Sequence, residues 1–148
     1  MKKLARILVP IGGNAAEDDA IRLACQTAKP DKAKVLLIHV IEVQRNLPVD
    51  AEIIHAQERG EQILGHAEEI ARAHYNQVES ELLQARVAGS ALVDEAVERG
   101  VDLIVMGVPY RKPLGDFYFG ATVSYVFKNA PGPVWLCRQP ATDAVKKK

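Results

Sequence analysis

The sequence predicts a single α/β domain in which a mostly parallel, five-stranded open sheet carries helices on both faces. Short apolar runs rich in β-branched residues alternate with longer stretches of helical periodicity, in the order βαβαβαβαβ. Several runs are apolar at nearly every position, as expected of parallel strands that are buried on both faces. The length of 148 residues suits one hydrophobic core.

The first strand is predicted over residues 5–11, ARILVPI, and a helix is predicted over residues 14–28. Asn14 is a suitable N-cap for this helix. Acidic residues follow it, near the positive end of the helix dipole: Glu17, Asp18 and Asp19. Four small or apolar residues fall on one face at helical spacing and are expected to be buried: Ile21, Ala24, Cys25 and Ala28.

The second strand is predicted over residues 33–41, AKVLLIHVI, with His39 as a buried and hydrogen-bonded imidazole. Residues 43–50 have no regular period and indicate a loop. A polar-rich helix is predicted from Ala51 to about Tyr75, with one face formed by Ile63, Ala67, Ile70 and His74. Because Gly60 and Gly65 weaken this helix, the sequence predicts a kink or a frayed start.

The third strand is predicted over residues 80–87 and is less apolar, which favours a place near the edge of the sheet. Ser90 is a candidate cap for the following helix, which would end near Gly100. The residues expected to face inward from this helix are Leu92, Val93, Ala96 and Val97.

The fourth strand is predicted over residues 101–107, VDLIVMG, with Ile104 and Val105 fully buried. A fourth helix is indicated by Val123, Val126, Phe127 and Ala130, and Pro131 closes it. The fifth strand is predicted over residues 133–138. Residues 1–138 are therefore expected to form the domain, and residues 139–148 a flexible basic tail.

Composition excludes several classes of function. Lys and Arg equal Asp and Glu at 19 each, and this balance gives no broad field to attract nucleic acid or an anionic membrane. No targeting segment or membrane-length apolar run is recognised, so we expect a cytoplasmic protein without membrane insertion. The two cysteines and four histidines lack the spacing of a redox or metal site. No motif pairs a nucleophile with a base, which predicts a protein that is not an enzyme.

In parallel α/β sheets, ligands bind at the carboxyl ends of the strands, where the strand order reverses. Three loops of this chain are expected to meet at such a place. They follow the first strand (residues 11–14), the second strand (residues 40–43) and the fourth strand (residues 107–120). The last of these loops contains two cations, two prolines and several aromatic rings, which singles it out as a candidate phosphate loop.

The chain resembles the universal stress protein family over nearly its whole length. The resemblance rests on ILVPIGG, LLIHVIE, VAGSALVDEAVERGVDLIVMG and GATVSYVFKNAPGPVWLCR. It implies a Rossmann-like sheet of strand order 3-2-1-4-5 and a homodimer paired through the last strand. The family includes members that bind ATP and members that do not, and its domain also occurs fused to transporters and kinases.

The resemblance also places a glycine motif of the ATP-binding members on this chain. Gly107 and Gly120 match its first and third glycines, whereas its second glycine corresponds to Tyr110. The hydroxyl that follows the third glycine corresponds to Ala121, with Thr122 next along. An aspartate that contacts adenosine in such members corresponds to Gly12. These departures predict a nucleotide pocket that keeps its frame and loses contacts to ATP.

The candidate nucleotide pocket therefore comprises Pro10, Ile11, Gly12, Val40, Met106, Gly107, Tyr110, Arg111, Lys112, Gly120, Ala121 and Thr122. Each has a plainer interpretation. Gly107 and Gly120 suit a strand end and a helix start, and Arg111 and Lys112 suit a solvated loop. The aromatic residues of this loop could stack on a base, or pack in the core or in a dimer.

We expect a regulatory or interaction module in stress adaptation, with a degenerate nucleotide pocket and an unidentified protein partner. Two alternatives stay open at this point. One is a sensor that binds ATP or AMP through Gly107, Gly120, Thr122 and the main chain of Pro10, Ile11 and Val40. The other is a weak ATP hydrolase, which the missing carboxylate and hydroxyl make less favourable.

Overall fold

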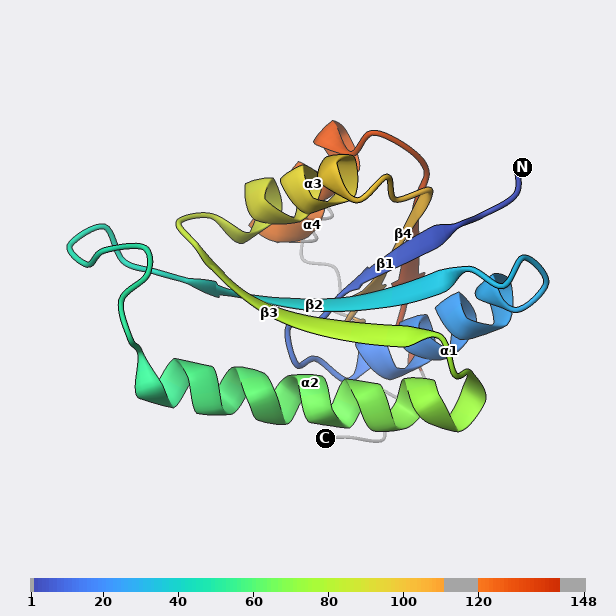
Figure 1. Cartoon of the computed structure of the whole chain (residues 1–148), viewed down its shortest axis with the longest axis horizontal. Coiled ribbons are helices and arrows are strands. Elements are labelled where there is room, and N and C mark those ends of the chain that lie inside the picture. Colours follow the sequence, from blue (N-terminus) through green and yellow to red (C-terminus); the bar gives the residue numbers. More distant parts are fainter. Residues whose placement is uncertain (1, 111–119, 142–148) are drawn as a thin grey trace.

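The computed structural model describes residues 2–110 and 120–141, and it has the predicted fold (Figure 1). One five-stranded sheet has the order β3-β2-β1-β4-β5, and all four pairs of neighbouring strands are parallel. The predicted order 3-2-1-4-5 is thus confirmed. The strands are β1 (Arg6–Pro10), β2 (Lys34–Glu42), β3 (Val78–Ala85), β4 (Leu103–Val108) and β5 (Val134–Arg138).

Helices cover both faces of the sheet (Figure 1). α1 (Ala16–Ala28) and α2 (Ile54–His74) pack on one face, and α3 (Ala88–Glu98) and α4 (Ala121–Asn129) pack on the other. The central strand β1 supplies side chains to both cores: Ile7 and Val9 join the cluster beneath α1 and α2, and Leu8 joins the cluster beneath α3 and α4. This explains why the strand is apolar at successive positions.

The buried face of α1 is as predicted, but its start is different. Ile21, Ala24, Cys25 and Ala28 are all fully buried. However, α1 begins at Ala16, and its first turn has no side-chain cap. The predicted capping role of Asn14 is therefore wrong, because its side chain bonds elsewhere.

α2 is one continuous helix of 21 residues that passes through both of its glycines, and it begins at Ile54, three residues later than predicted. Of the two predicted effects of the glycines, the late start agrees with a frayed start and the unbroken helix gives no sign of a kink. Gly60 is buried, and a Cβ at this position would lie 2.7 Å from Leu82 Cδ1 of β3 and 3.0 Å from His39 Cδ2 of β2. The glycine thus lets the helix approach the sheet closely. The predicted inward place of His74 is also wrong, since this side chain is exposed.

Two predictions about the third strand and α3 also need correction. β3 begins and ends two residues earlier than predicted. Ser90 lies inside α3, which starts at Ala88, and its hydroxyl donates to the Val87 carbonyl rather than capping the helix. Leu92 and Ala96 are buried as predicted, whereas Val97 is 61% exposed.

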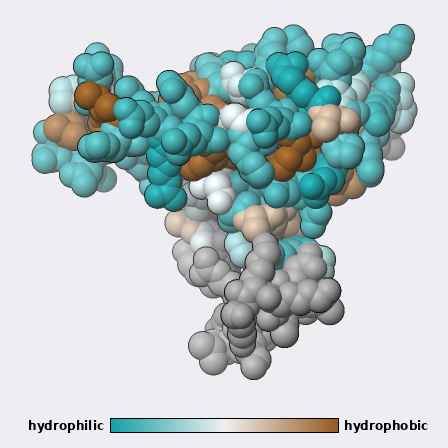
Figure 2. All heavy atoms as spheres, turned by 90° about the horizontal axis from the view of Figure 1, so that it is seen from below, coloured by the Kyte–Doolittle hydropathy of each residue, from teal (hydrophilic) through white to brown (hydrophobic). Residues whose placement is uncertain are grey.

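The face seen from the α2 side is largely hydrophilic (Figure 2). Hydrophobic residues gather at one end of it, where the loop between β2 and α2 projects from the domain (Figures 1 and 2). Leu47, Val49 and Ile54 of this segment are exposed. None of the helices in the described part of the chain is long and apolar enough to span a membrane.

β5 forms one edge of the sheet, and the chain remains attached to the sheet just beyond it. Gln139 is buried, and its backbone N–H donates to the Val108 carbonyl at 2.8 Å. Residues 142–148 of the predicted tail lie outside the described residues. Val134 and Leu136, on alternate positions of β5, are only half-buried against the core beneath α3 and α4.

Truncation of a buried side chain in β4, next to the central strand, should cost much of the stability. Ile104 of β4 is 2% exposed, and Ile104→Ala should lower the free energy of unfolding by about 2–5 kcal/mol. Ile54→Ala is the matched control, because Ile54 is 59% exposed, and it should cost about 0.5 kcal/mol or less. Urea unfolding of both variants measures the difference. Equal shifts would contradict the burial of Ile104 in β4 between β1 and β5.

The edge position of β5 predicts a two-fold homodimer paired through this strand, because an uncovered strand edge favours pairing with another chain. Light scattering at micromolar concentration should give twice the mass of the chain. A charge introduced by Val134→Asp should shift the protein towards monomer while circular dichroism shows a retained fold. A wild-type monomer, or a folded Val134→Asp dimer, would be evidence against this pairing.

Candidate functional site

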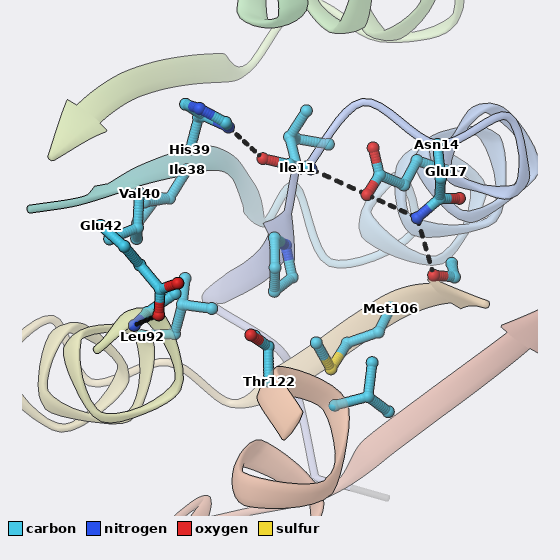
Figure 3. Close-up of a pocket in the computed structure, with 15 residues that line it drawn as sticks. Ile11, Asn14, Glu17, Ile38, His39, Val40, Glu42, Leu92, Met106 and Thr122 are labelled. Carbon is cyan, nitrogen blue, oxygen red and sulfur yellow. Dashed lines mark hydrogen bonds between the residues drawn. The ribbon is translucent and has the colours of Figure 1, made fainter. Parts of the chain in front are cut away.

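A cavity of about 360 Å³ lies at the carboxyl ends of β1, β2 and β4 (Figure 3). The starts of α3 and α4 form its opposite wall, through Ala88, Leu92, Thr122 and Val123. The volume is within the range of about 300–1,000 Å³ that is typical of small-molecule sites. The cavity therefore occupies the place where parallel α/β sheets bind their ligands.

Seven of the twelve predicted pocket residues line this cavity. They come from the ends of three strands and from the first turn of α4: Pro10, Ile11, Gly12, Val40, Met106, Gly107 and Thr122. The strand topology brings these distant segments together, as the sequence pattern indicated. The apolar side chains supply walls, and Thr122 supplies a hydroxyl on the α4 side of the cavity (Figure 3).

Of the other five predicted residues, three do not line the cavity and two lie outside the described residues. Tyr110 does not line it; the Tyr110 ring lies beneath the guanidinium of Arg138, 5.1 Å from the ring centroid. The cation–π contact turns this ring towards the end of β5. Gly120 and Ala121 also lie outside the lining. Arg111 and Lys112 lie outside the described residues, as do Phe117, Tyr118 and Phe119.

Gly107 and Gly120 each have a structural reason to be glycine. A Cβ at Gly107 would lie 2.6 Å from the Glu17 backbone nitrogen and 2.7 Å from the Ala16 carbonyl. Gly107 thus allows the start of α1 to contact the end of β4 directly. Gly120 has φ +98°, a conformation that side chains with a Cβ rarely adopt, and it lies immediately before α4.

A buried carboxylate from α1 forms part of the cavity wall. Glu17 is 6% exposed, and its side chain folds back onto the loop between β1 and α1. Its Oε2 accepts from the Gly12 backbone N–H at 2.8 Å, and its Oε1 accepts from the Gly13 backbone N–H at 2.8 Å. The Asn14 amide donates to the same Oε2 at 3.0 Å. Figure 3 shows Glu17 with Asn14 between this loop and β4.

Burial and hydrogen bonding act on Glu17 in opposite directions. Burial raises the pKa of its carboxyl above the ordinary value of 4.5, whereas the hydrogen bonds from Gly12, Gly13 and Asn14 favour the charged form. Burial is the larger effect, and the nearby Asp18 carboxylate adds to it. The three N–H donors therefore offset part, but not all, of the cost of burying the charged carboxylate.

Glu17 also lies close to position 12. A Cβ placed there would lie 3.5 Å from Glu17 Oε2, an ordinary van der Waals contact. Position 12 carries no carboxylate, and α1 brings the Glu17 carboxylate to the same edge of the cavity.

Asn14 joins the two halves of this edge. Its Nδ2 donates to Glu17 and also lies 3.5 Å from the Gly107 carbonyl of β4. Because the Glu17 carboxylate and the Gly107 carbonyl are both acceptors, the side-chain amide of Asn14 is oriented with its nitrogen towards them. Within the described part of the chain, Asn14 Oδ1 is a buried side-chain oxygen without a hydrogen-bond partner. The asparagine is thus oriented by the carboxylate and by β4, not by the helix that follows it.

The β2 side of the cavity is held by two further polar contacts. His39 Nδ1 lies 2.6 Å from the Ile11 carbonyl, which joins β2 to the end of β1 (Figure 3). His39 is only partly buried, but the predicted hydrogen bond is present. Glu42 accepts from the Ala88 backbone N–H at 2.9 Å, at the start of α3. These contacts set the spacing of the strand ends around the cavity.

Sequence reasoning missed eight lining residues: Asn14, Glu17, Ile38, His39, Glu42, Ala88, Leu92 and Val123. Glu17 is the most important of them. It was interpreted only through the helix dipole, yet a carboxylate soon after Gly-Gly is a signal that it could return to those amides. Ala88 and Leu92 reach the cavity because of how α3 packs on the sheet, and the local sequence pattern does not determine this packing.

A second cavity, of about 380 Å³, lies between α1 and α2 on the far side of the same loop. Ile11, Asn14 and Glu17 line both cavities. His66 of α2 lies beside this second space, and its Nε2 is 3.3 Å from Asp18 Oδ1. The loop between β1 and α1 is therefore a thin wall, with the Glu17 carboxylate inside it.

The sequence profile of the universal stress protein family matches residues 3–138. A universal stress protein of Methanocaldococcus jannaschii is 28% identical over 144 residues, which cover 93% of this chain and 84% of the relative. The match therefore extends over the sheet, all four helices and the cavity.

Solved structures share the fold. A universal stress protein in complex with cAMP superposes with a TM-score of 0.72 at 18% identity, covering 93% of this chain and 98% of the other. The universal stress protein from Archaeoglobus fulgidus in complex with dAMP gives 0.72 at 20% identity, covering 91% and 98%. At these identities the likeness concerns the fold.

The contact at Gly107 should be intolerant of one added methyl group. Gly107→Ala places a Cβ against the backbone of Ala16 and Glu17 and should cost about 1–3 kcal/mol of unfolding free energy. Gly65→Ala is the matched control, because its Cβ would meet nothing within 4 Å in α2, and alanine favours a helix by up to about 1 kcal/mol. Denaturant unfolding separates the two. A neutral Gly107→Ala would contradict the close approach.

The raised pKa of Glu17 gives a signed dependence on pH. In the window just above pH 4.5, the folded protein holds a proton at Glu17 that the unfolded chain has released. The stability of the wild type should therefore fall, relative to Glu17→Gln, as the pH rises through the raised folded pKa. Urea unfolding at a series of pH values measures this slope. A slope of the opposite sign would mean that the amide hydrogen bonds outweigh burial.

Proposed function

The chain belongs to the universal stress protein family, and from this we propose that it is a non-catalytic regulatory domain that binds an adenine mononucleotide. The observation that carries the proposal is the preformed cavity at the ends of β1, β2 and β4. It joins apolar walls suited to a base with a hydroxyl and a helix start suited to a phosphate.

The lining gives each part of such a ligand a place. Ile11, Val40 and Leu92 offer aliphatic surface for the flat base. Thr122 offers a hydroxyl, and α4 begins beside it at Ala121, where no side chain of the described residues caps the backbone N–H groups. Related folds solved with cAMP and dAMP support a ligand of this size.

A mononucleotide fits the departures from the ATP motif better than ATP does. Ala121 provides no hydroxyl, and Tyr110 places a ring at the position of the second glycine and turns it towards Arg138. Each lost hydrogen bond to a charged phosphate weakens binding by roughly tenfold or more. We therefore propose a pocket that is degenerate for ATP but competent for AMP.

The proposed role is binding without chemistry. Glu17 is the buried carboxylate of the cavity, and three N–H donors already hold it. A general base must be able to reach the proton it abstracts, and a carboxylate so engaged is poorly placed to do so. The homodimer, the cytoplasmic location and any fused transporter or kinase stay predictions from the sequence.

A second candidate function is a module that binds a protein partner without any nucleotide. The projecting loop between β2 and α2 favours it, because Leu47 and Val49 expose hydrophobic side chains there. In this case the exposed loop, and not the cavity, would carry the function.

Nucleotide binding should appear as thermal stabilisation. AMP at 100 times its dissociation constant should add about 2.7 kcal/mol, a rise of several degrees in melting temperature. Thr122→Val, which removes the cavity hydroxyl at nearly constant volume, should weaken AMP binding roughly tenfold. Thr27→Val is the matched control, since the Thr27 hydroxyl bonds to Leu23 within α1 and should leave the affinity unchanged.

Calorimetry with adenosine, AMP and magnesium-ATP then completes the test. AMP should bind more tightly than magnesium-ATP. If no adenine nucleotide binds or shifts the melting curve, the nucleotide proposal fails and the partner-binding module takes its place. If magnesium-ATP binds more tightly than AMP, the pocket is not degenerate.

A further inference from the structure

Three helices begin at the edge of the cavity, and two of these starts already carry an internal carboxylate. Glu17 accepts from the amides of the loop that leads into α1, and Glu42 accepts from the Ala88 N–H at the start of α3. α4 begins after Gly120, and among the described residues no side chain caps its start. The amides at the N-terminus of a helix attract anions. An anionic ligand would therefore find a carboxylate of the protein at the first two starts, whereas the described residues place none at the start of α4.

The amides of Gly12 and Gly13 form a small anion-binding nest. Consecutive backbone N–H groups at the carboxyl end of a strand commonly bind phosphate or carboxylate groups. Here both N–H groups point to Glu17, each at 2.8 Å from one of its oxygens, and Asn14 adds a third donor at 3.0 Å. Glu17 is 6% exposed, so this is a buried internal contact and not a loose surface pair.

We propose that Glu17 is the specificity residue of the cavity: it fills the anion nest between β1 and α1, excludes a phosphate there, and so directs a ligand's phosphate towards α4. This inference rests on the proposed function and names the orientation and charge class of the ligand. The cavity accepts a nucleotide whose neutral base and sugar lie near the β1 and β2 ends. Each additional phosphate lowers the affinity of the ligand where it approaches Glu17.

The physical reason is charge repulsion across a short, partly desolvated distance. Like charges a few ångströms apart interact by several kilocalories per mole at the effective dielectric of a protein surface, against about one in water. Glu42 adds a second negative charge to the cavity, but at the start of α3 and across the cavity from Glu17 (Figure 3). The start of α4, which no side chain caps among the described residues, carries the Thr122 hydroxyl and is the part of the cavity that contrasts with Glu17.

Calorimetry on charge variants tests the selectivity. Glu17→Ala empties the nest, Glu17→Gln keeps the shape without the charge, and Glu58→Gln removes an exposed charge of α2 as the control. Adenosine, AMP and magnesium-free ATP are titrated at pH 8. In both Glu17 variants the ratio of ATP affinity to adenosine affinity should rise about tenfold, and taking the ratio removes any effect of the substitution on the cavity wall as a whole. Glu58→Gln should leave the ratio as in the wild type.

A second measurement does not depend on any nucleotide binding. In ¹⁵N-labelled protein, pyrophosphate should shift the Gly12 and Gly13 amide signals of a folded Glu17 variant, but not those of the wild type. The inference is overturned if the affinity ratio is unchanged in both Glu17 variants. It is also overturned if pyrophosphate does not shift the Gly12 and Gly13 amide signals of these variants. If no adenosine compound binds to any variant while the two amides respond, the nucleotide proposal fails and the role of Glu17 as the internal anion stands.

Discussion

The site depends on the direct contact between the start of α1 and the end of β4. Gly107 has no side chain, so the backbone of Ala16 and Glu17 can lie against β4. This close approach carries Glu17 to the loop after β1, where its carboxylate accepts from Gly12 and Gly13. A methyl group at Gly107 would separate these elements and alter the cavity wall. The glycine that resembles part of a phosphate motif therefore also has a packing role.

Most of the fold could be predicted from the sequence, because parallel strands buried on both faces leave a strong pattern. Ile104 and Val105 lie in such a run, and both are buried as expected. The errors concern helix ends and single side chains. Asn14 and Ser90 are suitable caps by residue type, but tertiary contacts decide their bonds: Asn14 turns to Glu17 and Ser90 lies inside α3. At helix ends, tertiary packing can therefore override the capping preference of a residue.

The candidate site was only partly predictable, for a different reason. Topology placed Ile11, Val40 and Gly107 around one cavity, since strand ends of a parallel sheet meet at one edge. The role of Glu17 depends on a side chain that folds back along the chain onto the amides of Gly12 and Gly13. Residue types alone show that position 12 has no carboxylate, but they do not show that α1 brings one to the same loop. This arrangement is visible only in three dimensions.

The most direct test of the account is a crystal structure of the wild-type protein with AMP. We expect the phosphate at the start of α4 beside Thr122, the base near Val40, and the hydrogen bonds of Glu17 to Gly12 and Gly13 intact. A phosphate bound to the Gly12 and Gly13 amides, with Glu17 displaced, would contradict the account. So would AMP bound outside the cavity between the ends of β1, β2 and β4.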